Sequence, residues 1–234
     1  QYTVARDGRR ASAYESFLAP VRQRRNLTIL TGCTAKRLLL DGARATGVLC
    51  ERAGHELRFG ATGEVVVSAG VFHSPALLQR SGIGPGEWLA SLGIEIKRDL
   101  PAVGRHLCDH QSMAISYDLR RDPGLNREYL GWRVYRNVLR YFLTHRGPLA
   151  RVGMPITMLY ATTGQRDWPD LQLAAAPFAM RSSKEQKSDP GRGTITAAPG
   201  ITLCGFDLRQ RSRGSVRITS DDREMMPRVA AGRS

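Results

Sequence analysis

The sequence predicts an α/β protein, α+β overall, that is built in two parts. Residues 26–59 predict a three-stranded meander, and the β-branched run Glu64–Ser68 follows it, ending in a glycine turn and a helix start. Such unbroken apolar strands are typical of parallel sheets that are buried on both faces. After residue 113, short segments of alternating polarity predict an antiparallel sheet with helices. We therefore expect a domain boundary near residue 110.

The elements of the first part follow from spacing and turn signals. Residues 11–25 carry apolar side chains at helical intervals, which predicts a helix. Residues 26–40 predict the first extended segment, which the turn Asp41-Gly42 ends. Strands are expected at 45–52 and 55–59. Together these segments give the meander.

The strand–turn–helix arrangement that follows is the most specific local pattern in the chain. Val65–Val67 is expected to be a strand buried on both faces. Ser74 then offers a helix N-cap and Pro75 the first helical position, for a short helix over Ala76–Arg80. Helix N-termini present free amides that suit phosphate groups. An ordinary strand-to-helix connection is the alternative that this local pattern leaves open.

The remaining elements are short. A helix is predicted over 87–92 and a brief strand over 94–96. Residues 113–119 alternate in polarity as an exposed strand does, and 126–144 show helical spacing. A loop is expected over 181–194.

Composition narrows the class of protein. The chain has 234 residues, of which 41% are hydrophobic and 24% charged, so it is globular rather than disordered. It holds 35 Lys+Arg against 21 Asp+Glu, a formal net charge of +14. The densest basic groups, 22–25 and 209–213, form neither a long block nor a stripe, which favours a solvated surface over nucleic-acid binding. A basic nucleic-acid-binding module stays a remote alternative. No apolar run is long enough for a transmembrane segment.

Simple catalytic and metal motifs are missing from the sequence. The four cysteines are widely spaced, which predicts buried free thiols and no metal site. The five histidines lack H-E-x-x-H spacing, and neither a G-x-S-x-G elbow nor a Walker loop occurs. We therefore assign no catalytic residue and no metal ligand.

One segment carries a clear family resemblance. Residues 70–84, GVFHSPALLQRSGIG, resemble the second signature of the glucose–methanol–choline oxidoreductases, which are FAD-dependent alcohol dehydrogenases and oxidases. Ser74-Pro75, Leu77-Leu78 and residues 81–85 stand at the family's spacing, whereas Val71 departs from it. Residues 8–20, 26–31 and 99–110 also resemble the family. Residues 146–149, 169–172 and 211–216 resemble its choline-dehydrogenase-like branch.

The resemblance implies a fold, a reaction and a cofactor. Residues 1–110 would form part of a Rossmann-like FAD-binding domain with the meander, and 111–234 part of an antiparallel-sheet substrate-binding domain. The reaction would transfer a hydride from the CH–OH group of a small-molecule alcohol to flavin N5. By position, the residues implied to contact FAD, mainly around its adenosine portion, are Ala35, Ser68, Ala69, Gly70, Ser74 and Pro75.

Two parts of the family pattern have no counterpart in the sequence. The G-x-G-x-x-G loop is expected upstream of Gln1 and the catalytic segment beyond Ser234, and the tail 222–234 departs from the family, as in a truncated or frameshifted chain. We therefore expect the isolated chain neither to hold FAD tightly nor to oxidise alcohols. The alternative is a non-catalytic remnant that binds no cofactor. Localisation is unassigned, with the cytoplasm slightly favoured, and the oligomeric state stays open.

Overall fold

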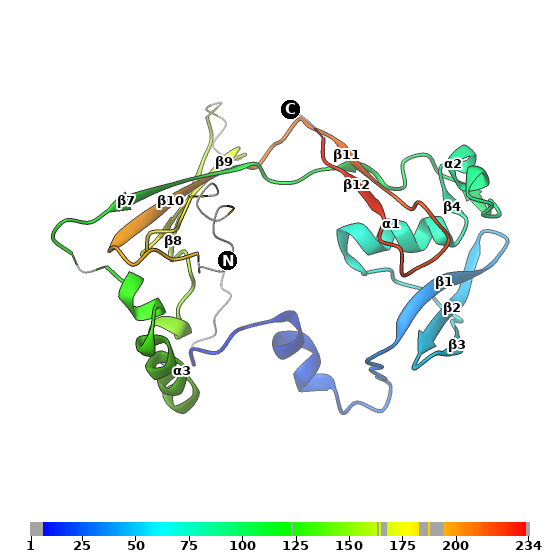
Figure 1. The fold of residues 1–234 in the computed structure, drawn as a ribbon. Helices are drawn as coiled ribbons and strands as arrows, with labels where there is room; N and C mark the ends of the chain where they lie inside the picture. The colour runs from blue at the N-terminus through cyan, green and yellow to red at the C-terminus, as the bar shows by residue number, and fades with distance from the viewer. Residues whose placement is uncertain are drawn as a thin grey trace. The chain divides into compact units, whose positions relative to one another are not determined.

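The computed structural model describes residues 7–122, 124–162, 164, 168–182, 187 and 194–232. The chain divides into two compact units. Unit 1 contains the N-terminal segment up to Thr28 together with His110–Arg209, and unit 2 contains Ile29–Asp109 together with the segment from Gln210 onward. Each unit has its own strands and helices (Figure 1), and the mixed α/β class predicted from the sequence is confirmed. The assignment of 1–110 and 111–234 to FAD and substrate domains stays a prediction.

The predicted meander forms the main sheet of unit 2. Strands β1 (Thr34–Asp41), β2 (Arg44–Arg52) and β3 (His55–Gly60) pair antiparallel in the order β1-β2-β3. Strand β1 begins later than expected, because its pairing with β2 starts at Thr34, opposite Glu51. A Cβ atom at Gly47 would lie 2.2 Å from the Phe59 carbonyl oxygen, so only glycine allows β2 and β3 to approach this closely.

Helix α1 (Gly70–Arg80) lies against β1 and β11 in unit 2. The hydrophobic core of unit 2 consists of Ala76, Leu89, Ile94 and Ile218, with Trp88 and Leu92 packed beside them. Helix α2 (Gly86–Ser91) confirms the helix predicted at 87–92. Two small sheets complete the unit. In the first, β4 (Ile83–Gly84) pairs parallel with β5 (Arg98–Asp99). The second has the strand order β12-β11-β6, formed by Arg228–Ala230, Gly214–Arg217 and Arg105–Leu107.

Three local expectations for unit 2 are wrong. Residues 64–68 form no strand, and Val66 is 80% exposed. A strand is buried on both faces when it belongs to a sheet with layers packed over both of its faces, and no strand in the described residues pairs with this run. Helix α1 begins at Gly70 rather than at Ser74, so Pro75 lies inside it. Residues 94–96 form no strand either, and the pairing partner of β4 is β5 instead.

Unit 1 contains the antiparallel sheet expected after residue 110. Its strand order is β7-β10-β9-β8, formed by Ser112–Asp118, Gly200–Asp207, Leu171–Ala176 and Ile156–Tyr160. Every residue of β7 is exposed, as the alternating pattern at 113–119 predicts. Most of the expected loop 181–194 lies outside the described residues.

The helices of unit 1 are more broken than the sequence predicts. The expected helix 126–144 divides into a 3-10 turn, η3 (Asn126–Tyr129), and helix α3 (Trp132–Thr144), because Gly131 between them has a φ of +57°. Another 3-10 turn, η4 (Pro148–Ala150), follows α3. Of the expected helix 11–25, a single π-helical turn, η1 (Tyr14–Leu18), and the 3-10 turn η2 (Ala19–Val21) form.

Buried Asn126 joins η3 to the loops beside the sheet of unit 1. Its side-chain oxygen accepts the N–H groups of Ala179 and Gly200, at 3.1 and 3.0 Å. Its amide donates to the Thr196 carbonyl oxygen at 2.9 Å. These bonds fix the position from which the chain enters α3.

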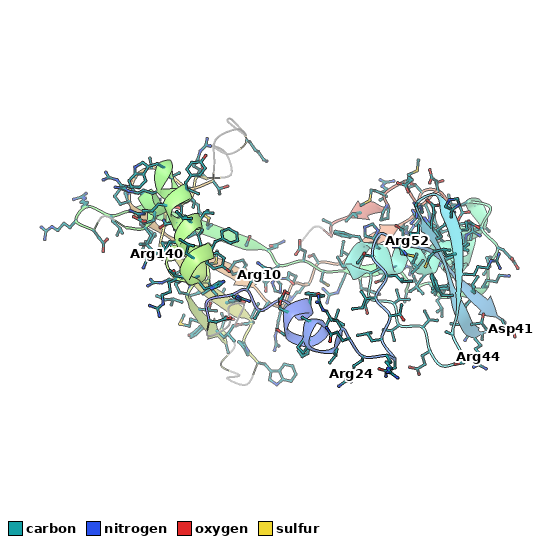
Figure 2. The ribbon with its side chains drawn as sticks, turned by 90° about the horizontal axis from the view of Figure 1, so that it is seen from below. Arg10, Arg24, Asp41, Arg44, Arg52 and Arg140 are labelled. Carbon is teal, nitrogen blue, oxygen red and sulfur yellow. The ribbon has the colours of Figure 1, made fainter. Side chains whose placement is uncertain are left out.

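Two arginines of the meander, Arg44 and Arg52, lie at opposite ends of β2. Figure 2 shows Arg44 near Asp41 at the β1–β2 turn and Arg52 at the other end of β2. Within the described residues, no helix is long and apolar enough to cross a lipid bilayer.

Candidate functional site

All six residues implied to contact FAD lie in unit 2. Ala35 is an exposed residue of β1, beside an irregularity in the pairing with β2 between Ala35 and Arg37. The exposed residues Ser68 and Ala69 precede α1, and Gly70 is its first residue. Ser74 and Pro75 lie half-buried within α1 rather than at its start. The structure therefore places Ser68, Ala69 and Gly70, and not Ser74, at the helix N-terminus.

The N-terminus of α1 is open. Ala69 occupies the N-cap position without a side-chain hydrogen bond to the helix, and Gly70 has a φ of +86°. A Cβ atom built on Gly70 would meet nothing within 4 Å. The amides of a first helical turn have no partner within the helix and carry its positive dipole end. Small residues at 68–70 therefore leave polar backbone groups accessible to a ligand.

The C-terminus of α1 is anchored to β1, the strand that carries Ala35. The Ser81 hydroxyl accepts the N–H of Leu38 at 2.8 Å and donates to the Leu77 carbonyl oxygen at 2.6 Å. Leu38 is three residues from Ala35 on the same strand, and Figure 1 shows α1 beside the meander. These bonds hold the helix and the strand of the candidate site in one arrangement.

Buried polar side chains at the end of α1 hold the C-terminal segment of unit 2. Gln79 is completely buried and bonds to the backbone of Val216 and Ile218. The Arg80 guanidinium donates to the carbonyl oxygens of Asp222 and Met225 at 3.0 and 2.7 Å. Burial lowers the pKa of Arg80, opposed by the nearby charges of Asp221 and Asp222. These polar contacts therefore position α1 from its far end.

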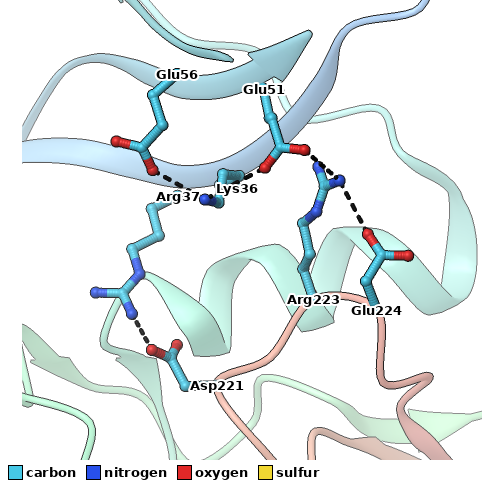
Figure 3. Close-up of polar contacts among 7 residues, drawn as sticks. All are labelled: Lys36, Arg37, Glu51, Glu56, Asp221, Arg223 and Glu224. Atoms are coloured by element: carbon cyan, nitrogen blue, oxygen red, sulfur yellow. Dashed lines mark hydrogen bonds and ion pairs between the residues drawn. The ribbon is translucent and has the colours of Figure 1, made fainter. Parts of the chain in front are cut away.

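An ion-pair network includes Lys36, which follows Ala35 on β1 (Figure 3). The Lys36 ammonium lies 2.8 Å from Glu56 and 3.5 Å from Glu51, and the hydrogen bond with Glu56 raises the pKa of Lys36. Two further pairs, Arg37–Asp221 and Arg223–Glu51, join the meander to the C-terminal segment, and Arg223 also pairs with Glu224 within that segment. The network lines a cavity of about 580 Å³ with charges of both signs. Each of the three cationic side chains of the network has a carboxylate partner, so the network joins the meander to residues 221–224.

The described residues contain no cluster of three or more His, Cys, Asp or Glu side chains that could hold a metal ion. The sequence pattern also gave no signal for Gln79, Arg80 or the Lys36 network. Their roles depend on contacts with residues 216–225, far along the chain.

Comparison with known proteins identifies the family. Residues 1–112 match the family model of the GMC oxidoreductases, and the chain is 34% identical over 232 residues to the oxygen-dependent choline dehydrogenase of Burkholderia pseudomallei. This chain belongs to the GMC oxidoreductase family. The family is enzymatic, and the resemblance seen in residues 70–84 is confirmed.

Other relatives agree with this membership. The oxygen-dependent choline dehydrogenase of Burkholderia multivorans is also 34% identical. Each alignment covers 97% of this chain and 39% of the relative, so the chain spans about two fifths of the length of these relatives.

Solved structures show the same fold. Pyridoxine 4-oxidase from Mesorbium loti is 26% identical with a TM-score of 0.73, covering 96% of this chain and 39% of that one. An Aspergillus oryzae formate oxidase variant, studied for the modification of its FAD, has a TM-score of 0.80 at 23% identity. That match covers 97% of this chain and 42% of the formate oxidase.

Proposed function

We propose that this chain is part of an FAD-dependent oxidoreductase that acts on the CH–OH group of a small alcohol. The observation that carries the proposal is the 34% identity to choline dehydrogenases over 97% of the chain. Choline is itself a primary alcohol, so an alcohol donor of this class is the substrate we propose.

Unit 2 supplies the adenosine side of the FAD site in this proposal. The open N-terminus of α1 fits a nucleotide, because Ser68, Ala69 and Gly70 leave its first amides uncovered. Ala35 offers strand backbone with a side chain no larger than a methyl group. Ser74 and Pro75 support the first turns of the helix from within.

Unit 1 supplies part of the substrate side. One face of its sheet carries an apolar groove of about 340 Å³, lined by residues of all four strands. Met113, Ile115, Met158 and Leu203 are among the lining residues and are 45–70% exposed. A groove of this kind suits the carbon skeleton of an alcohol.

FAD, when bound, supplies the chemistry by accepting a hydride from the alcohol carbon. The residues of this chain bind and orient. Gly70 lets backbone amides approach the ligand, and the Ser81–Leu38 contact keeps α1 fixed against the strand of Ala35. The chain contains no G-x-G-x-x-G loop, so the isolated 234 residues should bind FAD weakly.

The experiment compares the natural gene product that carries this segment with the isolated chain. We expect the natural product to contain about one FAD per chain and to reduce a dye with choline or another primary alcohol. The isolated chain should lose FAD on desalting, and AMP should compete for the weak binding that remains. A natural product that lacks flavin would contradict the proposal.

A matched pair of glycine variants tests the site itself. Gly70 and Gly54 have φ values of +86° and +80°, and an added Cβ atom meets nothing within 4 Å at either position. Gly70→Ala and Gly54→Ala should therefore strain the backbone equally. Only Gly70→Ala should lower the FAD content of the natural product. Equal FAD loss in both variants would show that Gly70 has no special role.

A further inference from the structure

Unit 1 contains a cavity of about 1190 Å³ with an unusual concentration of arginine. It lies beside α3 and is separate from the apolar groove of the sheet, with which it shares no lining residue. We call it the arginine cavity. Its charged lining residues are Arg127, Arg133, Arg136, Arg140, Arg146, Arg151, Asp7 and Glu128.

The helical repeat brings half of these arginines together. Arg133, Arg136 and Arg140 stand at positions i, i+3 and i+7 of α3, which places them on one face of the helix. The exposed side chains of Tyr135 and Phe142 lie on the other side of the helix. Trp132 instead packs beneath two of the arginines, with the Cζ atoms of Arg133 and Arg136 at 5.9 and 5.2 Å from its ring centroid.

The turn after α3 returns the chain to the same cavity. His145 ends the helix in the left-handed region, with a φ of +52°, and Gly147 has a φ of +101°. A Cβ atom at Gly147 would lie 3.3 Å from Arg140 Cδ and 3.5 Å from Arg140 Nε, so the Arg140 side chain rests over this glycine. The turn thereby brings Arg146 and Arg151 to the lining as well.

The positive charge of the cavity is not balanced within it. Six guanidinium groups face two carboxylates, a difference of +4. Both carboxylates already have partners: Glu128 contacts Arg136 and Asn137, and Asp7 lies 3.6 Å from Arg9. In the part of the chain that the structure describes, the guanidinium groups of Arg127, Arg140, Arg146 and Arg151 make neither a hydrogen bond nor an ion pair.

A concentration of unpaired guanidinium groups in one cavity favours a particular ligand chemistry. Clefts lined by charges of one sign concentrate counter-ions. The planar guanidinium fork pairs with phosphate through two parallel hydrogen bonds, and an oligophosphate can engage several forks at once. A single carboxylate would leave most of these charges unpaired.

We propose that the arginine cavity binds an oligophosphate, either free or as the phosphate chain of a nucleotide, through Arg140, Arg146 and their neighbours. This site lies in unit 1, whereas the proposed FAD contacts all lie in unit 2. The proposal therefore does not depend on the proposed function.

Calorimetric titration of the full chain with inorganic tripolyphosphate tests the proposal at physiological salt. The Arg140→Gln, Arg146→Gln double variant should weaken binding at least about tenfold, since each arginine contributes charge-assisted hydrogen bonds. The control is Arg24→Gln, Arg25→Gln, which removes two exposed arginines of the same unit that lie outside the cavity lining. This control should change the affinity less than about twofold. Circular dichroism confirms that both variants are folded.

Further measurements separate the sources and the alternatives. Arg140→Lys keeps the charge but loses the fork, so its affinity should lie between those of the wild type and the double variant. Equal affinity for tripolyphosphate and ATP indicates a free oligophosphate, and tighter ATP binding indicates a nucleotide; either outcome supports the proposal. No binding at millimolar tripolyphosphate overturns it. The proposal is also overturned if the control variant weakens tripolyphosphate binding as much as the Arg140→Gln, Arg146→Gln variant does. It is overturned too if the chain binds only single-stranded RNA and the double variant leaves that binding unchanged.

Discussion

The side-chain amide of Gln79, in the last turn of α1, donates to the carbonyl oxygen of Val216 at 3.0 Å. The same side chain accepts the N–H of Ile218 at 3.1 Å, and it is completely buried. One glutamine therefore satisfies two backbone groups of a segment that follows it by 137 and 139 residues. Gln79 therefore joins helix α1 to the C-terminal segment of unit 2.

Replacing Gln79 by methionine should destabilise unit 2 by about 2–4 kcal/mol, because the variant leaves two buried backbone groups without partners. Fluorine NMR of the fluorotryptophan-labelled chain in urea measures this, since Trp88 packs in unit 2 and donates to Ile218. The exposed control Gln23→Met should change stability by less than about 0.5 kcal/mol. Equal effects of the two variants on the Trp88 signal would contradict the prediction.

Gly104→Ala should destabilise unit 2 more than Gly54→Ala. Both glycines have positive φ values, +78° and +80°, so both variants incur a backbone cost of about 1–2 kcal/mol. A Cβ atom at Gly104 would also lie 2.1 Å from the Val216 carbonyl oxygen. A Cβ atom at Gly54 would have no neighbour within 4 Å. We expect a further loss of about 1–3 kcal/mol at Gly104 alone, measured by urea denaturation. Similar stabilities for the two variants would show that this approach is not tight.

The contribution of Glu128 to the stability of unit 1 should be present near neutral pH and lost in acid. The Asn137 amide, and next to it Arg136, hold the pKa of Glu128 below its ordinary value of 4.5. A lowered pKa in the folded state stabilises it above pH 4.5, and this stabilisation is lost as pH falls through the folded-state pKa. The destabilisation by Glu128→Gln should therefore be largest near neutral pH and shrink in acid. The Trp132 fluorine signal in urea series from pH 7 to 3 measures it; a pH-independent difference would be the contrary result.

The cysteines should differ in their rates of alkylation. The prediction of buried free thiols is confirmed for Cys50 and Cys204 and is wrong for Cys108, which is exposed. Burial raises the pKa of both buried thiols, and a hydrogen bond with Cys33 adds to the effect at Cys50. Because the thiolate is the reactive form, mass spectrometry at pH 8 should find Cys108 modified at least about tenfold faster than either buried cysteine. Labelling of Cys204 as fast as Cys108 would show that the sheet opens readily.

Local patterns predict the fold where the interactions are local. The meander, α2 and β7 follow from turn signals and alternation over short stretches. The run 64–68 has the composition of a buried strand, yet burial depends on a sheet and on layers packed over it, which its own sequence does not specify. The helix expected over 126–144 fails at Gly131, whose positive φ ends one helical segment before α3 begins.

The candidate site could be predicted in part for the same reason. The family spacing of residues 70–84 indicates the N-terminus of α1 correctly as a region, but it assigns the helix start to Ser74 rather than Gly70. The arginine cavity has a sequence signal only for Arg133, Arg136 and Arg140. The approach of Arg146 and Arg151 depends on the left-handed turn at His145 and Gly147, which the helical spacing does not reveal.

The Gln79 bridge has a consequence for the order of events during synthesis. Ile218 belongs to the core cluster with Ala76, Leu89 and Ile94, so unit 2 needs a residue made more than a hundred positions after the other three. The ribosome adds about 5–20 residues per second, so the incomplete core waits for several seconds at the least. During that interval the meander can pair, because its contacts are local, while α1 lacks the partners of Gln79. Unit 2 is thus a candidate for chaperone protection until residue 218 has left the ribosome.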